Sequence, residues 1–226
     1  MSVPSLTSFG ILTLAACTVG AYMIGSIPWA YLIVRWVTGL DITAHGTGNV
    51  GAMNVRRTTG SWKWFVVAMF ADGFKGLIPV AVVRFTLPAL GFDAAATTLA
   101  MQVTVFGVVI GHNFSMWLAI SKRSFVRTGK GLATGGGAIF AYDPWYFLIA
   151  VVVGVGTIAI TRYMMAGQVA AAFALPVAAL LLRRPDWPFA LLMGATVYAA
   201  HHKRFVGLLH GREPKLYVDD GGGPRG

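Results

Sequence analysis

The residues best suited to chemistry are concentrated between two long apolar segments, in the sixteen-residue stretch from His45 to Gly60. This stretch holds four glycines, two asparagines and two arginines, and it contains no acidic residue. Glycines let backbone N–H groups approach an anion closely, and arginine presents a planar cationic group that suits phosphate. The composition predicts a phosphate-binding loop at a membrane surface. A basic loop that only touches lipid headgroups is the alternative that composition leaves open.

A second basic, glycine-rich stretch begins at Lys122 and ends at Gly131, and more glycines follow at positions 135–137. The helix expected after this stretch would direct its positively polarised N-terminus toward the same place. We therefore predict a second anion site. A nucleotide-binding P-loop requires Ser or Thr directly after its lysine, but Lys130 is followed by glycine, so we exclude nucleotide hydrolysis.

The elements that must position these loops are long apolar segments. Apolar residues make up 56% of the chain, and the mean hydropathy is +0.68. Runs of about 20 apolar residues are long enough to cross a membrane as helices. We predict an all-α polytopic membrane protein with about seven transmembrane helices and glycine-rich cytoplasmic loops. The expected spans are residues 9–37, 62–85, 95–118, 131–142, 145–161, 164–182 and 187–201.

Three further expectations follow from this arrangement. Pro28 should kink the first span, and the span at 131–142 is so short that it could be re-entrant instead. One integral-membrane domain should cover residues 1–203, followed by a polar cytoplasmic tail over 204–226.

The basic residues predict the orientation of the chain in its membrane. The chain carries 18 basic and 8 acidic residues, and the basic ones lie mostly in short loops. With seven spans and the N-terminus outside, fourteen basic residues fall on one side and three on the other. The positive-inside rule then places both glycine-rich loops and the C-terminus in the cytoplasm. The charges are thus explained by topology and anionic ligands, and no nucleic-acid partner is expected.

Two ionisable residues interrupt the second span. Asp72 and Lys75 are three positions apart, so they lie on one helical face and could pair. Ionisable groups at such a depth are costly and often functional. A buried ion pair that only fixes helix packing explains them equally well.

The order of these motifs resembles the PlsY family, the bacterial acyl-phosphate:glycerol-3-phosphate acyltransferases. The resemblance runs nearly end to end, starting from Gly25-Ser26-Ile27-Pro28. The family motifs are matched by residues 46–60, 72–76, 111–112 with 129–134, and, in part, 201–213. One such motif would be weak support, whereas several in the right order are highly specific.

The resemblance implies a membrane enzyme of phospholipid synthesis with a cytoplasmic-side active site in the bacterial cell membrane. Members transfer a fatty acyl group from acyl phosphate to the 1-hydroxyl of glycerol 3-phosphate, giving lysophosphatidic acid and phosphate. No metal, nucleotide or other cofactor is implied. The acyl chain would enter from the membrane lipid and the polar acceptor from the cytosol.

The resemblance also implies site residues. Asn49, Arg57 and Lys130 would bind phosphate, Thr47 would donate a hydrogen bond near the reacting groups, and His201 would orient a substrate or take part in proton transfer. Thr47, Lys130 and His201 form the expected catalytic set. The expected substrate- and phosphate-binding set is Gly46, Gly48, Asn49, Asn54, Arg57, Lys75, His112, Gly129, Gly131, Arg204 and Glu213.

Five positions depart from the family pattern. They are Thr47 for serine, Met53 for threonine, Thr128 for glycine, Arg204 for asparagine and Gly207 for arginine. These departures leave open a divergent paralogue that acylates another acceptor. A transporter or binding protein for phosphate compounds is a further alternative, but it would favour inverted repeats, and the sequence contains none.

Overall fold

A computed structural model of the protein describes residues 8–125, 128–213 and 215. Across these residues the chain forms ten α-helices and one short 3-10 helix. The helices separate into two compact units, residues 1–144 and residues 145–226, and each is described by itself below.

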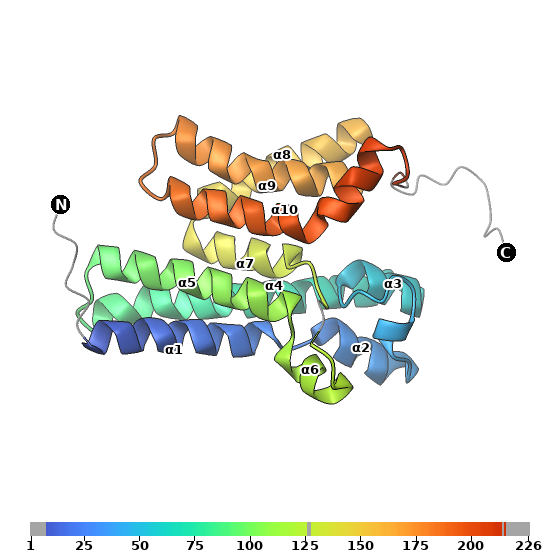
Figure 1. Ribbon diagram of the computed structural model, residues 1–226, viewed down its shortest axis with the longest axis horizontal. Helices are drawn as coiled ribbons and strands as arrows, with labels where there is room; N and C mark the ends of the chain where they lie inside the picture. Colours follow the sequence, from blue (N-terminus) through green and yellow to red (C-terminus); the bar gives the residue numbers. More distant parts are fainter. Residues whose placement is uncertain (1–7, 126–127, 214, 216–226) are drawn as a thin grey trace. The chain divides into compact units, whose positions relative to one another are not determined.

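The first unit contains both glycine-rich loops. Figure 1 shows α1, α4 and α5 running alongside one another, with α2, α3 and α6 beyond one end of them. The helices of this unit are α1 (Ser8–Gly25), α2 (Trp29–Thr38), η1 (Ile42–Ala44), α3 (Ala52–Thr59), α4 (Trp62–Ala89), α5 (Ala94–Asn113), α6 (Met116–Lys122) and α7 (Leu132–Tyr142).

The first apolar segment is broken at the predicted proline. Helix α1 ends at Gly25 and α2 begins at Trp29, because Pro28 has no N–H to continue the helical hydrogen bonds. Gly25 also lets α1 lie against α5, since a Cβ there would be only 2.3 Å from the Val108 carbonyl oxygen.

Helices α4 and α7 cross at very short range because glycines line the crossing. A Cβ on Gly76 would lie 2.0 Å from the Thr134 carbonyl oxygen, and a Cβ on Gly137 would lie 2.0 Å from that of Gly73. Small residues allow such backbone contact between apolar helices. The crossing holds the start of α7, and therefore the end of the second loop, against the middle of α4.

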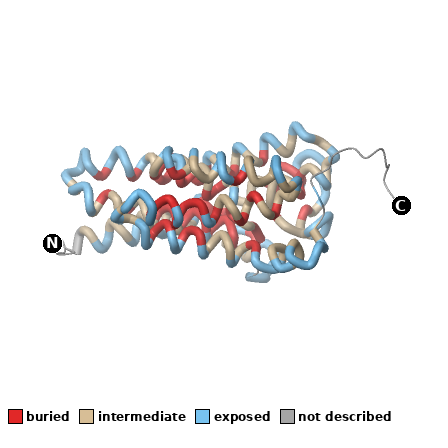
Figure 2. The backbone as a smooth tube through the Cα atoms, turned by 90° about the horizontal axis from the view of Figure 1, so that it is seen from above, coloured by how far each residue is buried: buried red, intermediate tan, exposed pale blue. Residues whose placement is uncertain are grey.

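The second unit contains α8 (Pro144–Thr161), α9 (Met164–Leu181) and α10 (Trp187–Leu209). Helices α9 and α10 pack closely, since a Cβ on Gly194 would lie 2.7 Å from the Ala172 carbonyl oxygen. Figure 2 shows long buried stretches in the middle of the long helices.

Helices are present at each of the seven expected places, but three segments differ from the expected boundaries. Residues 52–59, expected as loop, form α3; residues 116–122 form the separate helix α6; and α10 continues to Leu209, eight residues beyond the expected end at 201. The expected tail therefore starts as helix, and residues 216–226 lie outside the described part of the chain.

Five segments of the described chain are long and apolar enough to cross a membrane: Gly10–Thr38, Trp62–Ala89, Ala94–Lys122, Pro144–Thr161 and Met164–Leu181. Leu132–Tyr142 is apolar but has only 11 residues, about 16 Å of helix at 1.5 Å per residue. The protein is thus an all-helical, multi-pass membrane protein, whereas the full count of seven crossings stays a prediction.

Candidate active site

The first glycine-rich loop is folded around the side chain of Asn54. Asn54 lies on α3 and is 2% exposed. Its Oδ1 accepts a hydrogen bond from the Thr47 backbone N–H at 3.0 Å, and its Nδ2 donates to the carbonyl oxygens of His45 at 3.0 Å and Ile42 at 3.3 Å. One buried amide therefore fixes both ends of the tight turn that contains Gly46.

Glycine is required inside this turn. Gly46 and Gly48 have φ of +58° and +67°, in the left-handed region that side chains disfavour. A Cβ on Gly46 would also lie 2.2 Å from Asn54 Oδ1 and 3.7 Å from the Cβ of Arg57. The turn thus brings Gly46 and Thr47 close to the start of the Arg57 side chain. Thr47 and Arg57 are exposed, and Asn49 is partly buried.

The second loop is fixed by Thr128. Its N–H donates to the Asn113 carbonyl oxygen at 2.8 Å, and its hydroxyl lies 3.4 Å from the His112 and Asn113 carbonyl oxygens and from the Ser115 N–H. Thr128, which departs from the family pattern, is also buried, and its side chain connects the loop to the C-terminal end of α5. Gly131, with φ of +72°, then starts α7.

A backbone hydrogen bond joins the two loops. The Val50 N–H donates to the Thr128 carbonyl oxygen at 2.7 Å. Lys130 follows two residues later, and the first loop ends at Gly51, where α3 begins. Each loop thus leads directly into a helix N-terminus, the kind of position where backbone N–H groups bind anions.

Asp72, Lys75 and His112, which the sequence analysis singled out, are buried next to the second loop. Asp72 Oδ1 is 2.8 Å from Lys75 Nζ, so the predicted pairing is confirmed. His112 Nδ1 lies 3.7 Å from the same carboxylate oxygen. Lys75 also donates to the Ile27 carbonyl oxygen at 2.7 Å, in the break between α1 and α2. Asp72, Lys75 and His112 are 2%, 5% and 8% exposed, so their contacts in this structure are with protein groups.

An ion pair outside the spans supports the base of the first loop. Asp41 pairs with Lys122, from the end of α6, and its side chain also accepts hydrogen bonds from the Thr43 N–H and hydroxyl at 3.0 Å and 2.6 Å. The hydrogen bonds from Lys122 and Thr43 lower the pKa of the Asp41 carboxyl to about 2. Asp41 therefore stays ionised and caps η1 at neutral pH.

The third motif lies in the second unit. His201 is buried on α10, and its Nδ1 is 2.8 Å from the Val197 carbonyl oxygen. Arg204 binds Glu213 with two nitrogens: Nε is 3.0 Å from Oε1 and Nη2 is 2.5 Å from Oε2. Gly207 lies beside the same carboxylate, since a Cβ on Gly207 would be 3.5 Å from Glu213 Oε1. Arg204 and Gly207, which both depart from the family pattern, therefore lie next to Glu213.

The expected site residues thus fall into three groups. The two joined loops carry Gly46, Thr47, Gly48, Asn49, Gly129, Lys130 and Gly131, and α3, which follows the first loop, carries Asn54 and Arg57. Lys75 and His112 lie buried next to them, and His201, Arg204 and Glu213 belong to the second unit. The sequence did not single out Thr134 or Thr128 as parts of the site, because neither type of residue is distinctive without knowledge of its neighbours. Within the described residues, no group of three His, Cys, Asp or Glu is placed to hold a metal ion.

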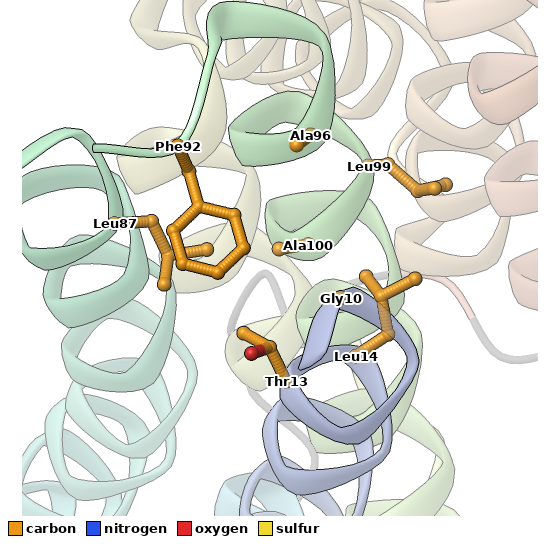
Figure 3. Close-up of a pocket in the computed structure, with 8 residues that line it drawn as sticks. All are labelled: Gly10, Thr13, Leu14, Leu87, Phe92, Ala96, Leu99 and Ala100. Carbon is orange, nitrogen blue, oxygen red and sulfur yellow. The ribbon is translucent and has the colours of Figure 1, made fainter. Parts of the chain in front are cut away.

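A small apolar pocket of about 40 Å³ lies elsewhere in the first unit (Figure 3). Its walls come from the N-terminal ends of α1 and α5, which include Thr13, the C-terminal end of α4, which includes Leu87, and Phe92 in the loop between α4 and α5. The glycine-rich loops lie at the other ends of α4 and α5. The pocket is therefore separate from the candidate active site.

Comparison with known proteins identifies this arrangement. The family model described as glycerol-3-phosphate acyltransferase matches residues 15–211. A glycerol-3-phosphate acyltransferase from Thermus thermophilus is 37% identical over 87% of this chain and 92% of its own length. One from Desulforamulus reducens is 31% identical over 91% of this chain and 96% of its own length. Two crystal structures of PlsY, an integral membrane glycerol 3-phosphate acyltransferase, share the fold. The glycerol 3-phosphate form has a TM-score of 0.75 at 28% identity over 90% of this chain and 96% of its own. The lysophosphatidic acid form has a TM-score of 0.71 at 27% identity over 93% of this chain and 96% of its own.

The helices, the apolar spans and the structural matches define the class: a multi-pass integral membrane enzyme. The chain belongs to the PlsY-type glycerol-3-phosphate acyltransferase family.

Proposed function

We propose that this glycerol-3-phosphate acyltransferase takes its acyl group from an acyl phosphate and places it on the sn-1 hydroxyl of glycerol 3-phosphate. The product of the enzyme is lysophosphatidic acid, and the reaction begins phospholipid synthesis. The donor and the position of acylation are the parts that go beyond family membership. They rest on the motifs, and two phosphate-bearing substrates suit a site built from two basic, glycine-rich loops.

The observation that carries this proposal is the hydrogen bond from the Val50 N–H to the Thr128 carbonyl oxygen. It joins two loops that lie 78 positions apart at these atoms, and each loop ends at a helix N-terminus. Lys130 follows in one loop, and Asn49 precedes in the other. Such a pairing supports binding of two phosphate groups close together, as transfer between two phosphate compounds requires.

The roles assigned to individual residues follow the chemistry of their groups. Arg57 and Lys130 supply positive charge and Asn49 a neutral amide for the phosphates. Thr47 supplies a hydroxyl next to Gly46, and His201 orients a substrate or accepts a proton. Arg204 and Glu213 are bound to each other, so we assign them to holding the end of α10 and not to direct phosphate contact.

The reaction needs positioning and charge stabilisation more than a strong base. The acceptor hydroxyl oxygen attacks the acyl carbon, a new ester bond forms, and the bond from that carbon to the phosphate oxygen breaks. The proton of the hydroxyl can pass to the departing phosphate. Cations at the loops stabilise the charge that develops on this leaving group, and such preorganised charges supply a large share of catalysis.

The same proposal includes an orientation. The N-terminus would lie outside a bacterial cell membrane, and the active site and the C-terminal end would lie in the cytoplasm. Both glycine-rich loops carry basic residues, which supports this orientation by the positive-inside rule. Glycerol 3-phosphate would enter from the cytosol and the acyl donor from the lipid.

The test is an assay of purified protein in detergent with an acyl phosphate and glycerol 3-phosphate, following phosphate release and lysophosphatidic acid. Lys130→Ala is the test variant and Lys63→Ala, an exposed lysine at the start of α4, is the matched control. We expect turnover that needs both substrates and falls at least about 100-fold in Lys130→Ala only.

Two results would contradict the proposal in different ways. Equal activity of Lys130→Ala and Lys63→Ala would remove Lys130 from the active site. Phosphate release with another polyol, but none with glycerol 3-phosphate, would make the chain a paralogue with a different acceptor.

A further inference from the structure

We propose that Asp72, His112 and Thr134 are positioning residues that hold the Gly129–Gly131 segment, and with it Lys130, in its active conformation. This inference rests on the proposed role of Lys130 and goes beyond it. The three residues come from α4, α5 and α7. They contact protein groups in this structure and act on substrate only through the loop.

The first step of the argument is the contact between His112 and the loop. A Cβ on Gly129 would lie 2.4 Å from His112 Nε2 and 2.7 Å from the His112 carbonyl oxygen. The loop therefore lies directly against the imidazole ring, one residue before Lys130. A change in the position of this ring must move the loop.

The second step is what holds the ring. His112 Nδ1 is 3.2 Å from Thr134 Oγ1 and 3.7 Å from Asp72 Oδ1. Its other ring nitrogen faces Gly129. Thr134 is fully buried, on the first turn of α7, so the hydroxyl links the ring to the helix that the loop enters. The imidazole ring of His112 is thus held in place by contacts with both α7 and α4.

The third step is the anchor of Asp72. Its carboxylate is paired with Lys75 at 2.8 Å, and Lys75 Nζ also donates to the Ile27 carbonyl oxygen in the α1–α2 break at 2.7 Å. The backbones of α4 and α7 are in close contact at Gly76 and Gly137, so Asp72 and Thr134 lie on two helices that pack directly against each other. Because polar groups buried in such surroundings are costly to leave unpaired, the chain of contacts is rigid.

If these residues served helix packing alone, their series of contacts would not need to extend to the Gly129–Gly131 segment. The α4–α7 crossing is already made by glycine backbones, and the Asp72–Lys75 pair is complete without His112. The contacts of His112 connect that pair to the one segment that carries Lys130. Groups that orient a direct ligand in this way typically change affinity or activity by about 10- to 100-fold when removed.

The experiment compares three variants at two buried threonines, Thr134 and Thr104. Thr134→Val removes the hydroxyl that contacts His112, and Thr134→Ser keeps it. Thr104→Val is the matched control, because the Thr104 hydroxyl is buried in α5 and bonds to the Ala100 carbonyl oxygen of its own helix at 2.7 Å and to Cys17 of α1, neither of which belongs to the glycine-rich loops. Steady-state kinetics for both substrates and the melting temperature in detergent are measured for each.

We expect Thr134→Val to raise KM for a phosphate substrate about tenfold and to lower the melting temperature, because the buried His112 Nδ1 loses its hydroxyl partner, with Thr134→Ser near wild type and the kinetics of Thr104→Val unchanged. Asp72→Asn should act in the same direction. In the Lys130→Ala background, Thr134→Val should cost nothing further, because the group that it positions is already absent. Equal kinetics of Thr134→Val and Thr104→Val, or full additivity with Lys130→Ala, would overturn the proposal.

Binding of inorganic phosphate to the same variants separates this proposal from the proposed function. If wild type shows no acyl transfer, the function fails, yet weaker phosphate binding in Thr134→Val than in Thr104→Val would still support the positioning role. Equal phosphate affinity of those two variants would end it.

Discussion

Single side chains determine the shape of the first loop, and Asn54 gives the sharpest test. We expect Asn54→Asp to lose activity at least about tenfold, because a carboxylate cannot donate to the carbonyl oxygens of His45 and Ile42. Leaving buried carbonyl groups without donors costs about 1–3 kcal/mol, so the melting temperature should also fall. Thr59→Ala, on the same helix, is the control, since its hydroxyl bonds to the Val55 carbonyl oxygen and to the Ser61 N–H and not to the first loop. Wild-type activity in Asn54→Asp would refute this account of the loop.

The contact between Arg204 and Glu213 predicts a measurable coupling. Removing either side chain should destabilise the C-terminal end of α10, and removing both should cost less than the sum. We expect a coupling of about 1 kcal/mol, because the pair is doubly hydrogen-bonded but Arg204 is partly exposed. Thermal unfolding of Arg204→Ala, Glu213→Gln and the double variant measures it, with exposed Lys203→Ala as the control. Strict additivity would show that the contact contributes nothing.

At the residue scale, the sequence predicted what lies close in the chain and missed what lies far apart. The pairing of Asp72 and Lys75 followed from helical spacing and is confirmed at 2.8 Å. The approach of His112 and Thr134 to that pair could not be predicted, because they lie on two other helices. The same limit applies to Thr128, whose contacts with α5 only a three-dimensional arrangement can reveal.

Among the elements, the crossing of α4 and α7 should be the most sensitive to added volume. Gly137→Ala would place a methyl group 2.0 Å from the Gly73 carbonyl oxygen, so the helices must separate. We expect a loss of about 1–3 kcal/mol in stability and a large loss of activity, since α7 carries the end of the second loop. Gly156→Ala is the matched control, because nothing lies within 4 Å of its Cβ on α8. Melting temperature and turnover of both variants decide the point, and similar behaviour of the two would contradict it.

The ion pair between η1 and α6 predicts a pH dependence. Asp41 has its pKa lowered to about 2 by Lys122 and Thr43, below the usual value of 3.8. Its pairing therefore stabilises the fold fully above about pH 4 and is lost as the pH falls toward 2. We expect the difference in melting temperature between wild type and Asp41→Asn to be constant from pH 7 to 5 and to shrink below pH 4. A difference that stays constant down to pH 2 would mean that this pair is not responsible.

The long helices could be predicted because about 20 apolar residues in a row have few alternatives to a membrane-spanning helix. The short helices could not. Residues 52–59 contain two arginines, an asparagine and two threonines. Helix α3 is stabilised by Val55, which packs in a buried cluster with residues of α2, and by Asn54, whose amide bonds to the loop before the helix. Helix α6 follows α5 after only Phe114 and Ser115, so hydropathy alone cannot separate the two.

For the whole molecule, motif order was the strongest predictor of function. The family model covers residues 15–211, which includes every motif that the sequence analysis used except the last two residues of the third, Arg212 and Glu213. Roles of individual residues were less predictable, because the motifs divide between two units of the fold. The first unit contains Thr47, Asn49 and Lys130 on two joined loops and Arg57 on the helix α3 that follows the first loop. The role of His201 stays a prediction from the resemblance.

The orientation of the whole chain is the last prediction, and it depends on where the basic residues lie. If the N-terminus is outside, the first span ends before the Asp41–Gly60 loop in the cytoplasm, and α4 returns the chain to the outside near Leu90. The next crossing brings Arg123 and the second loop back to the cytoplasm. Leu90 and Arg123 are both exposed, so each is suitable for labelling.

A single-cysteine experiment tests this orientation directly, because the chain has only one native cysteine, Cys17. In a Cys17→Ala background, Leu90→Cys should react with a membrane-impermeant maleimide in intact bacterial cells. Arg123→Cys should react only after the cells are permeabilised, and both should react in detergent. The positive-inside rule favours this pattern because the basic loops resist transfer across the membrane. The reverse pattern would place the active site outside the cell, where a cytosolic acceptor could not reach it, and would contradict the proposed orientation.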